Sequence, residues 1–178
     1  VPGAMPFTRG RAIRDPLAPW DVRQWHDDPD TAATRAAILD DLEHGVSSVW
    51  LQIGADGLAP GDVPVALGGV DLAIAPVVVS SWDDQNGAAA ALLAVLKESD
   101  RSAVSGNLGL DPLGAAARTG ADPDLSGLAQ GVADVGDLPK VRAITVDARP
   151  YHDAGADDVD EIAYAVATGV TYLRHLAD

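Results

Sequence analysis

A short polar stretch near the C-terminus holds the residues best suited to chemistry. Residues 147–156 follow a predicted strand, precede an acidic predicted helix, and include Tyr151 and His152. In proteins built of alternating strands and helices, the segments at the carboxyl ends of strands carry the catalytic groups. His152 is therefore a candidate general acid or hydrogen-bond donor to a substrate carbonyl, with Tyr151 as its polar neighbour. The alternative, a histidine that only caps or packs, stays open.

The same stretch repeats part of a metal-binding pattern. His152 and Gly155 match the last two positions of Asp-x-His-x-x-Gly, through which some proteins supply a histidine to the cobalt of cobalamin. Pro150 stands where that pattern has aspartate. The aspartate matters because it orients the ligating imidazole through a hydrogen bond. We therefore expect no cobalt ligation by His152.

The N-terminal stretch is the one locally basic part of the chain. It holds Arg9, Arg11, Arg14 and Arg23, and it shows no periodicity of a strand or helix. Guanidinium groups pair bidentately with phosphate, so these residues could meet the phosphates of a ligand. Ordinary ion pairs with nearby carboxylates would account for them equally well. Residues 1–30 are predicted to form an irregular segment.

Composition excludes several classes of function. The chain has 178 residues, with 12 Lys and Arg against 27 Asp and Glu and a formal net charge of -15. This charge opposes binding to nucleic acid or to an anionic membrane. No apolar run approaches the roughly 18 to 20 residues that span a bilayer, and the start of the chain lacks the layout of a signal peptide. We expect a soluble, cytoplasmic protein. The absence of cysteine excludes disulfides, thiol nucleophiles and thiolate metal sites.

The elements that must position these residues alternate along the chain. Strands are predicted at 46–53, 71–79, 103–106 and 141–147, and helices at 31–44, 64–70, 86–97, 125–135 and 157–176. The strands are apolar runs without alternation, which is typical of parallel strands buried on both faces. This order predicts an α/β fold. The last helix carries an apolar stripe made of Val159, Ile162, Ala163, Val166, Val170 and Leu173.

The choice within the α/β class is between an open doubly wound sheet and a barrel. Residues 54–57, which follow the first predicted strand, contain no Gly-x-Gly-x-x-Gly turn, and no phosphate-binding loop is found elsewhere. A complete (β/α)₈ barrel needs about 250 residues. We therefore predict a partial TIM-type barrel over residues 31–178. A partial barrel leaves strand edges and apolar surface uncovered, which favours a partner or self-association.

Several collinear blocks then carry a family resemblance. They are PFTRG at 6–10, PWDVRQ at 19–24, GV at 45–46, YH with AGA at 151–156, and EIAY with ATGVTYL at 161–173. In this order they closely resemble the substrate barrel of the methylmalonyl-CoA mutase family, adenosylcobalamin-dependent isomerases of acyl-CoA thioesters. The resemblance implies roughly the first five βα units of a barrel threaded by the pantetheine arm of CoA. It also implies a cobalamin domain that these 178 residues do not include.

Within that family, residues 45–53 and 104–109 resemble the small, non-catalytic chain of heterodimeric bacterial enzymes. Catalytic chains carry a tyrosine just after the Arg-Gly pair, where this chain has residues 11–14, Arg-Ala-Ile-Arg. The resemblance implies a large catalytic subunit as partner, and adenosylcobalamin held by the holoenzyme and not by this chain. His152 matches the catalytic histidine, in a shortened loop that indicates a vestigial role. The implied substrate-binding positions are Arg9, Arg23, Gln24 and Tyr151.

The sequence is compatible with three functions. The first is the small subunit of a mutase that interconverts methylmalonyl-CoA and succinyl-CoA, inactive alone and supporting its catalytic partner. The second is a divergent mutase subunit that itself binds a CoA ester. The third is an α/β binding module without a reaction. For the first, we expect the segment around Arg9, Trp20 and Arg23 to contact the partner, and a separated fragment to self-associate through its sheet edge.

Overall fold

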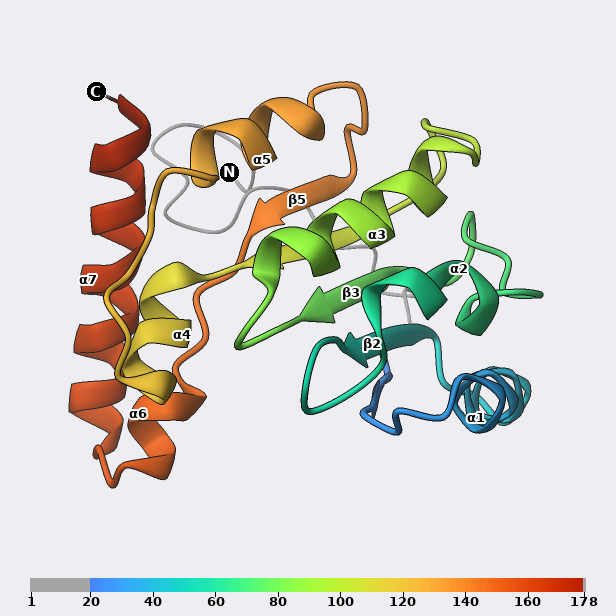
Figure 1. Cartoon of the computed structure of the whole chain (residues 1–178), viewed down its shortest axis with the longest axis horizontal. Helices are drawn as coiled ribbons and strands as arrows, with labels where there is room; N and C mark the ends of the chain where they lie inside the picture. The colour runs from blue at the N-terminus through green and yellow to red at the C-terminus, as the bar shows by residue number, and fades with distance from the viewer. Residues whose placement is uncertain (1–19, 178) are drawn as a thin grey trace.

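Five strands form one parallel sheet in their order along the chain (Figure 1). They are β1 (Arg23–His26), β2 (Ser48–Gln52), β3 (Val77–Ser80), β4 (Gly106–Leu110) and β5 (Val141–Ile144). Every neighbouring pair runs parallel, with β1 and β5 at the two edges. The computed structural model describes residues 20–177 of the chain. The predicted α/β class and the parallel pairing are thus confirmed.

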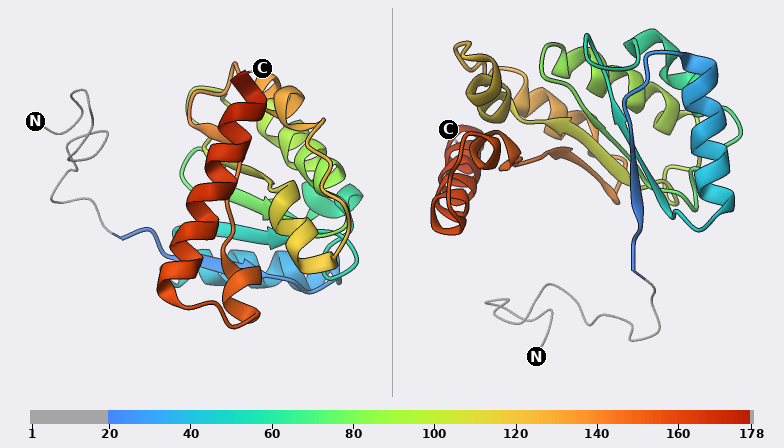
Figure 2. Two further views of the ribbon diagram at one scale, coloured as in Figure 1. Left: turned by 90° about the vertical axis from the view of Figure 1, so that its left-hand side faces the viewer. Right: turned by 90° about the horizontal axis from the view of Figure 1, so that it is seen from below.

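Helices cover one face of this sheet. α1 (Thr31–Glu43), α2 (Val63–Ala66), α3 (Gln85–Lys97) and α5 (Leu128–Asp134) lie along the same side, and a 3₁₀ turn (Pro60–Asp62) precedes α2 (Figure 2). Three further helices lie towards the carboxyl ends of the strands: α4 (Pro112–Thr119), α6 (Arg149–Asp153) and α7 (Asp158–Ala177) (Figure 1). None of the helices that the structure describes is long and apolar enough to span a membrane.

The hydrophobic core lies between the sheet and its covering helices. Alternate residues of the strands point to this side, among them Val49, Leu51, Val77 and Val79, which are all buried. The residues between them face the other side of the sheet, where the polar side chains of Gln52 and Ser80 lie. The apolar residues of the strands are therefore buried against helices on one face of the sheet. The other face carries aromatic and polar side chains.

β1 corrects the prediction that residues 1–30 are irregular. Residues 23–26 pair with residues 48–51 of β2 in parallel register. Only His26 of this strand is buried, so the segment lacks the apolar alternation by which strands are recognised. Its place is fixed by backbone pairing at the sheet edge and by the Arg23 side chain, whose Nε donates to Ser48 Oγ at 3.0 Å.

Two other strands begin later than predicted. β3 begins at Val77, because the backbone N–H groups of Ile74 and Ala75 bond back to the carbonyl of Asp71 in a turn. β4 covers residues 106–110, whereas the sequence pattern predicts a strand at 103–106. A Cβ at Gly109 would lie 1.9 Å from the Val79 carbonyl oxygen, and its φ is +72°. Glycine, usually a loop signal, is here what lets two strands approach.

The helices at the carboxyl end of the sheet depart most from the prediction. α4 and α6 were not expected, although Pro112 and Pro150 each stand in a first helical turn, which proline tolerates. α7 was expected, but its apolar stripe is exposed: Val159, Ile162, Val166 and Leu173 each have 60% or more of their surface accessible. The helix instead buries Thr168 and Tyr172.

Candidate functional site

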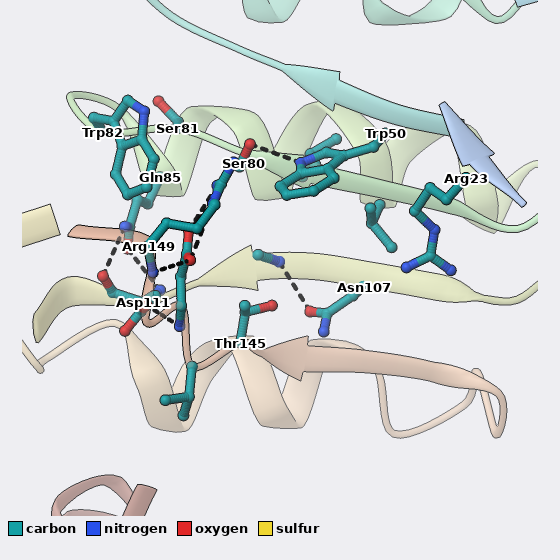
Figure 3. A pocket seen from close by; sticks show the side chains of 15 residues that line it. Arg23, Trp50, Ser80, Ser81, Trp82, Gln85, Asn107, Asp111, Thr145 and Arg149 are labelled. Atoms are coloured by element: carbon teal, nitrogen blue, oxygen red, sulfur yellow. Dashed lines mark hydrogen bonds and ion pairs between the residues drawn. The ribbon is translucent and has the colours of Figure 1, made fainter. Parts of the chain in front are cut away.

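The carboxyl half of the open sheet face forms a cavity of about 340 Å³ (Figure 3). Side chains from every strand or from the segment after it line this cavity, so its shape depends on the whole sheet. The lining includes Arg23, Trp50, Ser80, Trp82, Asp111, Asp147 and Arg149. Cavities at the carboxyl ends of parallel strands are where α/β proteins place ligands.

Arg149 is the central cation of this cavity. Its Nε lies 3.0 and 2.9 Å from the two carboxylate oxygens of Asp147, and its Nη2 lies 2.6 Å from Oδ2. The guanidinium carbon is also 4.4 Å from the ring centre of Trp50 and 5.5 Å from that of Trp82. A planar guanidinium suits both contacts at once. The Arg149 charge is thus neutralised within the protein.

Arg23 reaches the cavity from the edge strand and is paired in a similar way. Its Nη2 lies 2.9 Å from Asp21 Oδ2, and its Nε donates to Ser48 Oγ. The Asp21 carboxylate also accepts a hydrogen bond from Ser47 at 2.7 Å. Because both lining arginines have carboxylate partners, the cavity does not present an unpaired positive charge from either of them.

A chain of hydrogen bonds crosses the same face of the sheet. Trp50 Nε1 donates to Ser80 Oγ at 2.8 Å, and Ser80 Oγ donates to Gln52 Oε1 at 2.7 Å. This chain fixes the indole plane against which Arg149 stacks. The polar groups on the face therefore bind one another and hold the cavity wall in one arrangement.

Asp111, at the end of β4, ties four elements together. Its carboxylate accepts hydrogen bonds from the Tyr172 hydroxyl of α7, from Gly114 N of α4 at 3.2 Å, and from Asp147 N at 2.8 Å. Burial raises the pKa of Asp111, and burial also raises the pKa of Tyr172. Gln85 of α3 completes the junction by donating to the Asp111 carbonyl and accepting from its N–H, both at 2.9 Å.

The histidine and tyrosine selected from the sequence lie outside the cavity. His152 is on α6 with 70% of its side chain exposed, and its Nδ1 bonds the Glu161 carboxylate of α7. That hydrogen bond raises the pKa of His152. Tyr151 stacks on Tyr164, with ring centres 4.6 Å apart, in a shallow hollow between α6 and α7. The structure therefore separates this pair from the lining.

The remaining predicted positions divide in the same way. Arg23 lines the cavity, whereas Gln24 is exposed on the edge strand and its Nε2 donates to the Trp25 carbonyl at 3.3 Å. Arg9 lies outside the described residues. Within residues 20–177, no group of three or more His, Asp or Glu side chains is arranged to hold a metal ion.

Sequence reasoning missed most of the lining. Trp50 sits within an apolar run, Trp82 in a loop, and Arg149 within the candidate stretch, where it was given no role. The signal that could have found Trp50 is a large indole on the side of the strand opposite the aliphatic core residues Val49 and Leu51. Trp82 and Arg149 come together only through the fold.

The fold and the cavity define a parallel α/β protein with its site at the carboxyl end of the sheet. The chain belongs to the methylmalonyl-CoA mutase family, whose family model, described as methylmalonyl-CoA mutase, matches residues 61–178. It is similar to the methylmalonyl-CoA mutase small subunit of Propionibacterium freudenreichii subsp. shermanii, with 45% identity over 99% of this chain and 28% of that protein. The small subunit of Streptomyces virginiae is 42% identical over 99% of this chain and 30% of that protein.

A more distant relative has a similar name. A probable methylmalonyl-CoA mutase small subunit of Mycobacterium tuberculosis is 35% identical over the full chain and 30% of its own length. The chain thus spans less than a third of the length of these curated relatives. The resemblance to the mutase family that the sequence blocks carry is confirmed.

Proposed function

We propose that this chain is the first part of the substrate-type barrel of a mutase small subunit, which supports a large catalytic subunit and does not turn over substrate itself. The names of the relatives support this proposal, since each is named as a methylmalonyl-CoA mutase small subunit or a probable one. Such a heterodimer would interconvert methylmalonyl-CoA and succinyl-CoA. The five strands would correspond to the first five βα units of a TIM-type (β/α)₈ barrel, with the cavity on its interior face.

The observation that carries the non-catalytic role is the internal pairing of the cavity. Arg149 is bound to Asp147 and stacked on Trp50, and Arg23 is bound to Asp21. Substrate recognition needs polar groups that are free to bind the ligand, and breaking these pairs would cost part of the binding energy. His152, the family-matched histidine, is held by Glu161 outside the cavity.

The cofactor of the family does not fit the described residues. Mutases of this family depend on cobalamin. Pro150 replaces the orienting aspartate of the ligand pattern, and His152 lines neither the main cavity nor the hollow beside Tyr151. The Glu161 carboxylate occupies the imidazole Nδ1, and 70% of the His152 side chain is exposed. We assign adenosylcobalamin to the holoenzyme, through its catalytic subunit, and expect none bound to this chain.

Arg23 gives the alternative function its support. It lies on the cavity wall at the sheet edge, where a CoA ester that entered the interior face would pass. A subunit that binds such an ester itself would lose affinity when Arg23 is removed. The N-terminal segment would then serve the ligand, whereas in the first proposal it contacts the partner subunit.

The deciding experiment measures turnover and ester binding together. The protein carrying this chain is assayed for methylmalonyl-CoA isomerisation with adenosylcobalamin, alone and with the large subunit, and is titrated calorimetrically with a CoA ester. We expect turnover only with the large subunit and no saturable ester binding by the chain alone. Turnover by the chain alone would overturn the proposal. Ester binding that Arg23→Gln weakens, while Arg174→Gln on α7 leaves it unchanged, would support the alternative.

A further inference from the structure

A second cavity, of about 470 Å³, lies beside the first, over the carboxyl ends of β1 and β2. Two tryptophans, one glutamine, two arginines and three aspartates line it. Trp82 and Arg149 form the wall that it shares with the first cavity. This lining carries both charges beside aromatic surface, a combination that the proposed role as a supporting subunit does not require.

Gln52 is the buried polar group of this second cavity. The side chain is only 1% exposed, yet its Nε2 has no hydrogen-bond partner among residues 20–177. In the structure Ser80 Oγ accepts from Trp50 Nε1 and donates to Gln52 Oε1, so Nε2 is the atom of the amide that is left without a partner. A buried donor without an acceptor costs about 1–3 kcal/mol. The site thus offers an N–H group for which a ligand oxygen is the natural partner.

Arg118 supplies positive charge to the same cavity. It stands in the last turn of α4, with its guanidinium carbon 4.7 Å from the ring centre of Trp82. Within the described part of the chain, no carboxylate lies at ion-pair distance from it, whereas Arg149 is neutralised by Asp147. An amide N–H and a free guanidinium lining one cavity are a donor set that suits a carboxylate.

Three carboxylates and an indole line the rest of the cavity. Asp27, Asp56 and Asp153 come from three separate segments, and none of their carboxylates takes part in an ion pair or side-chain hydrogen bond among residues 20–177. Trp25 lines the cavity with 45% of its surface accessible. Carboxylates beside an aromatic face favour an organic ammonium ion. A metal ion is not favoured, since the aspartates are not grouped as metal ligands.

We propose that this second cavity binds a small zwitterion with the charge pattern of an amino acid. Its carboxylate would accept from Gln52 Nε2 and pair with Arg118. Its ammonium group would lie towards Asp27, Asp56 and Asp153, against the face of Trp25. The cavity is large enough for a compound of this size. The ligand's carboxylate would meet a buried N–H group that has no hydrogen-bond partner among residues 20–177.

Calorimetric titration with three matched probes tests the proposal. L-valine carries both charges, isobutylamine lacks the carboxylate, and isovalerate lacks the ammonium group; the other proteinogenic amino acids follow valine. We expect saturable binding of at least one amino acid, and at least tenfold weaker binding of both single-charge probes. Gln52→Leu and the exposed Arg118→Gln should each weaken binding at least tenfold, whereas Arg174→Gln should not. The Gln52 side-chain amide resonances should shift with the bound ligand.

Several outcomes would overturn the proposal. They are an isovalerate or isobutylamine affinity equal to that of valine, no saturable binding by any amino acid, and binding that Arg118→Gln leaves unchanged. If Gln52→Leu does not fold, the Arg118→Gln variant and the Gln52 amide shifts in the parent protein still decide. None of these readouts depends on mutase turnover, so failure of the subunit role would not decide this question.

Discussion

The charged side chains of the cavity show how local pairing limits what a site can do. Arginine is a residue type that often binds the charged group of a substrate. The guanidinium of Arg149 is instead bound by the carboxylate of Asp147, which lies two residues earlier in the chain. The stacking of Arg149 on Trp50 then fixes the guanidinium plane. A residue type alone thus does not predict a role, because the partners within hydrogen-bond distance decide whether its charge is available.

His152 allows a direct test of such pairing. The Glu161 carboxylate raises the pKa of His152. The variant Glu161→Gln should therefore lower the pKa of His152 towards the ordinary value near 6.5. Titration of the imidazole resonances by NMR measures the change. His44 is the control, because a hydrogen bond to the Asp40 carbonyl raises its pKa and Glu161 plays no part there.

The same pairing has a consequence for stability. A histidine whose pKa is higher in the folded than in the unfolded state contributes to the unfolding free energy, and this contribution is fully present below about pH 6.5. That contribution is lost as the pH rises through the folded pKa. The unfolding free energy of Glu161→Gln should therefore lack this part of the pH dependence. An unchanged His152 titration in the variant would show that the contact with Glu161 does not form in solution.

Among the elements, α7 is attached in a way that its sequence pattern does not indicate. The apolar stripe of the helix is exposed, and Tyr172 anchors the helix through Asp111 and through the N–H of Leu113, which donates to the hydroxyl at 2.8 Å. A helix usually packs through its apolar stripe. Here a buried polar junction holds α7, and its apolar stripe is exposed and able to pack against another surface.

Tyr172→Phe should therefore loosen α7. The change removes one donor to the buried Asp111 carboxylate and the acceptor for Leu113 N–H, so we expect a loss of about 1–3 kcal/mol in unfolding free energy. Hydrogen exchange should rise along α7. Tyr164→Phe is the matched control, because the Tyr164 hydroxyl has no hydrogen bond among residues 20–177. Equal stability of the two variants would disprove the junction.

Gly109 tests the close approach of β3 and β4. Alanine there would meet the Val79 carbonyl at 1.9 Å and would keep a φ of +72°. We expect a loss of more than about 2 kcal/mol, since the left-handed backbone alone costs roughly 1–2 kcal/mol. Chemical denaturation measures it. Gly61→Ala, where a Cβ meets nothing within 4 Å, should change the stability little. Comparable losses in both variants would contradict the strand geometry.

For the molecule as a whole, the sequence predicts the class of fold better than the site. The helices at 31–44 and 86–97 were predicted to within a residue at each end, because their caps Asp30 and Asp84 and their composition agree with the fold. β1 and the cavity wall were not predictable. Their residues come together through pairing over distances of 25 residues or more, as in the bonds from Arg23 to Ser48 and from Trp50 to Ser80.

The exposed surfaces of the molecule point to association. Within residues 20–177, no further strand pairs with the sheet edges at β1 and β5, and the apolar stripe of α7 is exposed. Such surfaces would be costly on an isolated monomer. We therefore expect the protein that carries this chain to bind a large mutase subunit, and the chain on its own to self-associate. The segment before β1, which includes Arg9 and Trp20, is proposed to take part in that contact.

Sedimentation velocity of this protein, alone and mixed with the large methylmalonyl-CoA mutase subunit, tests the subunit role most directly. We expect a heterodimer in the mixture, formed at micromolar or lower concentration, and self-association of the chain when the large subunit is absent. A well-folded chain that stays strictly monomeric alone and sediments independently of the large subunit in the mixture would contradict the subunit role.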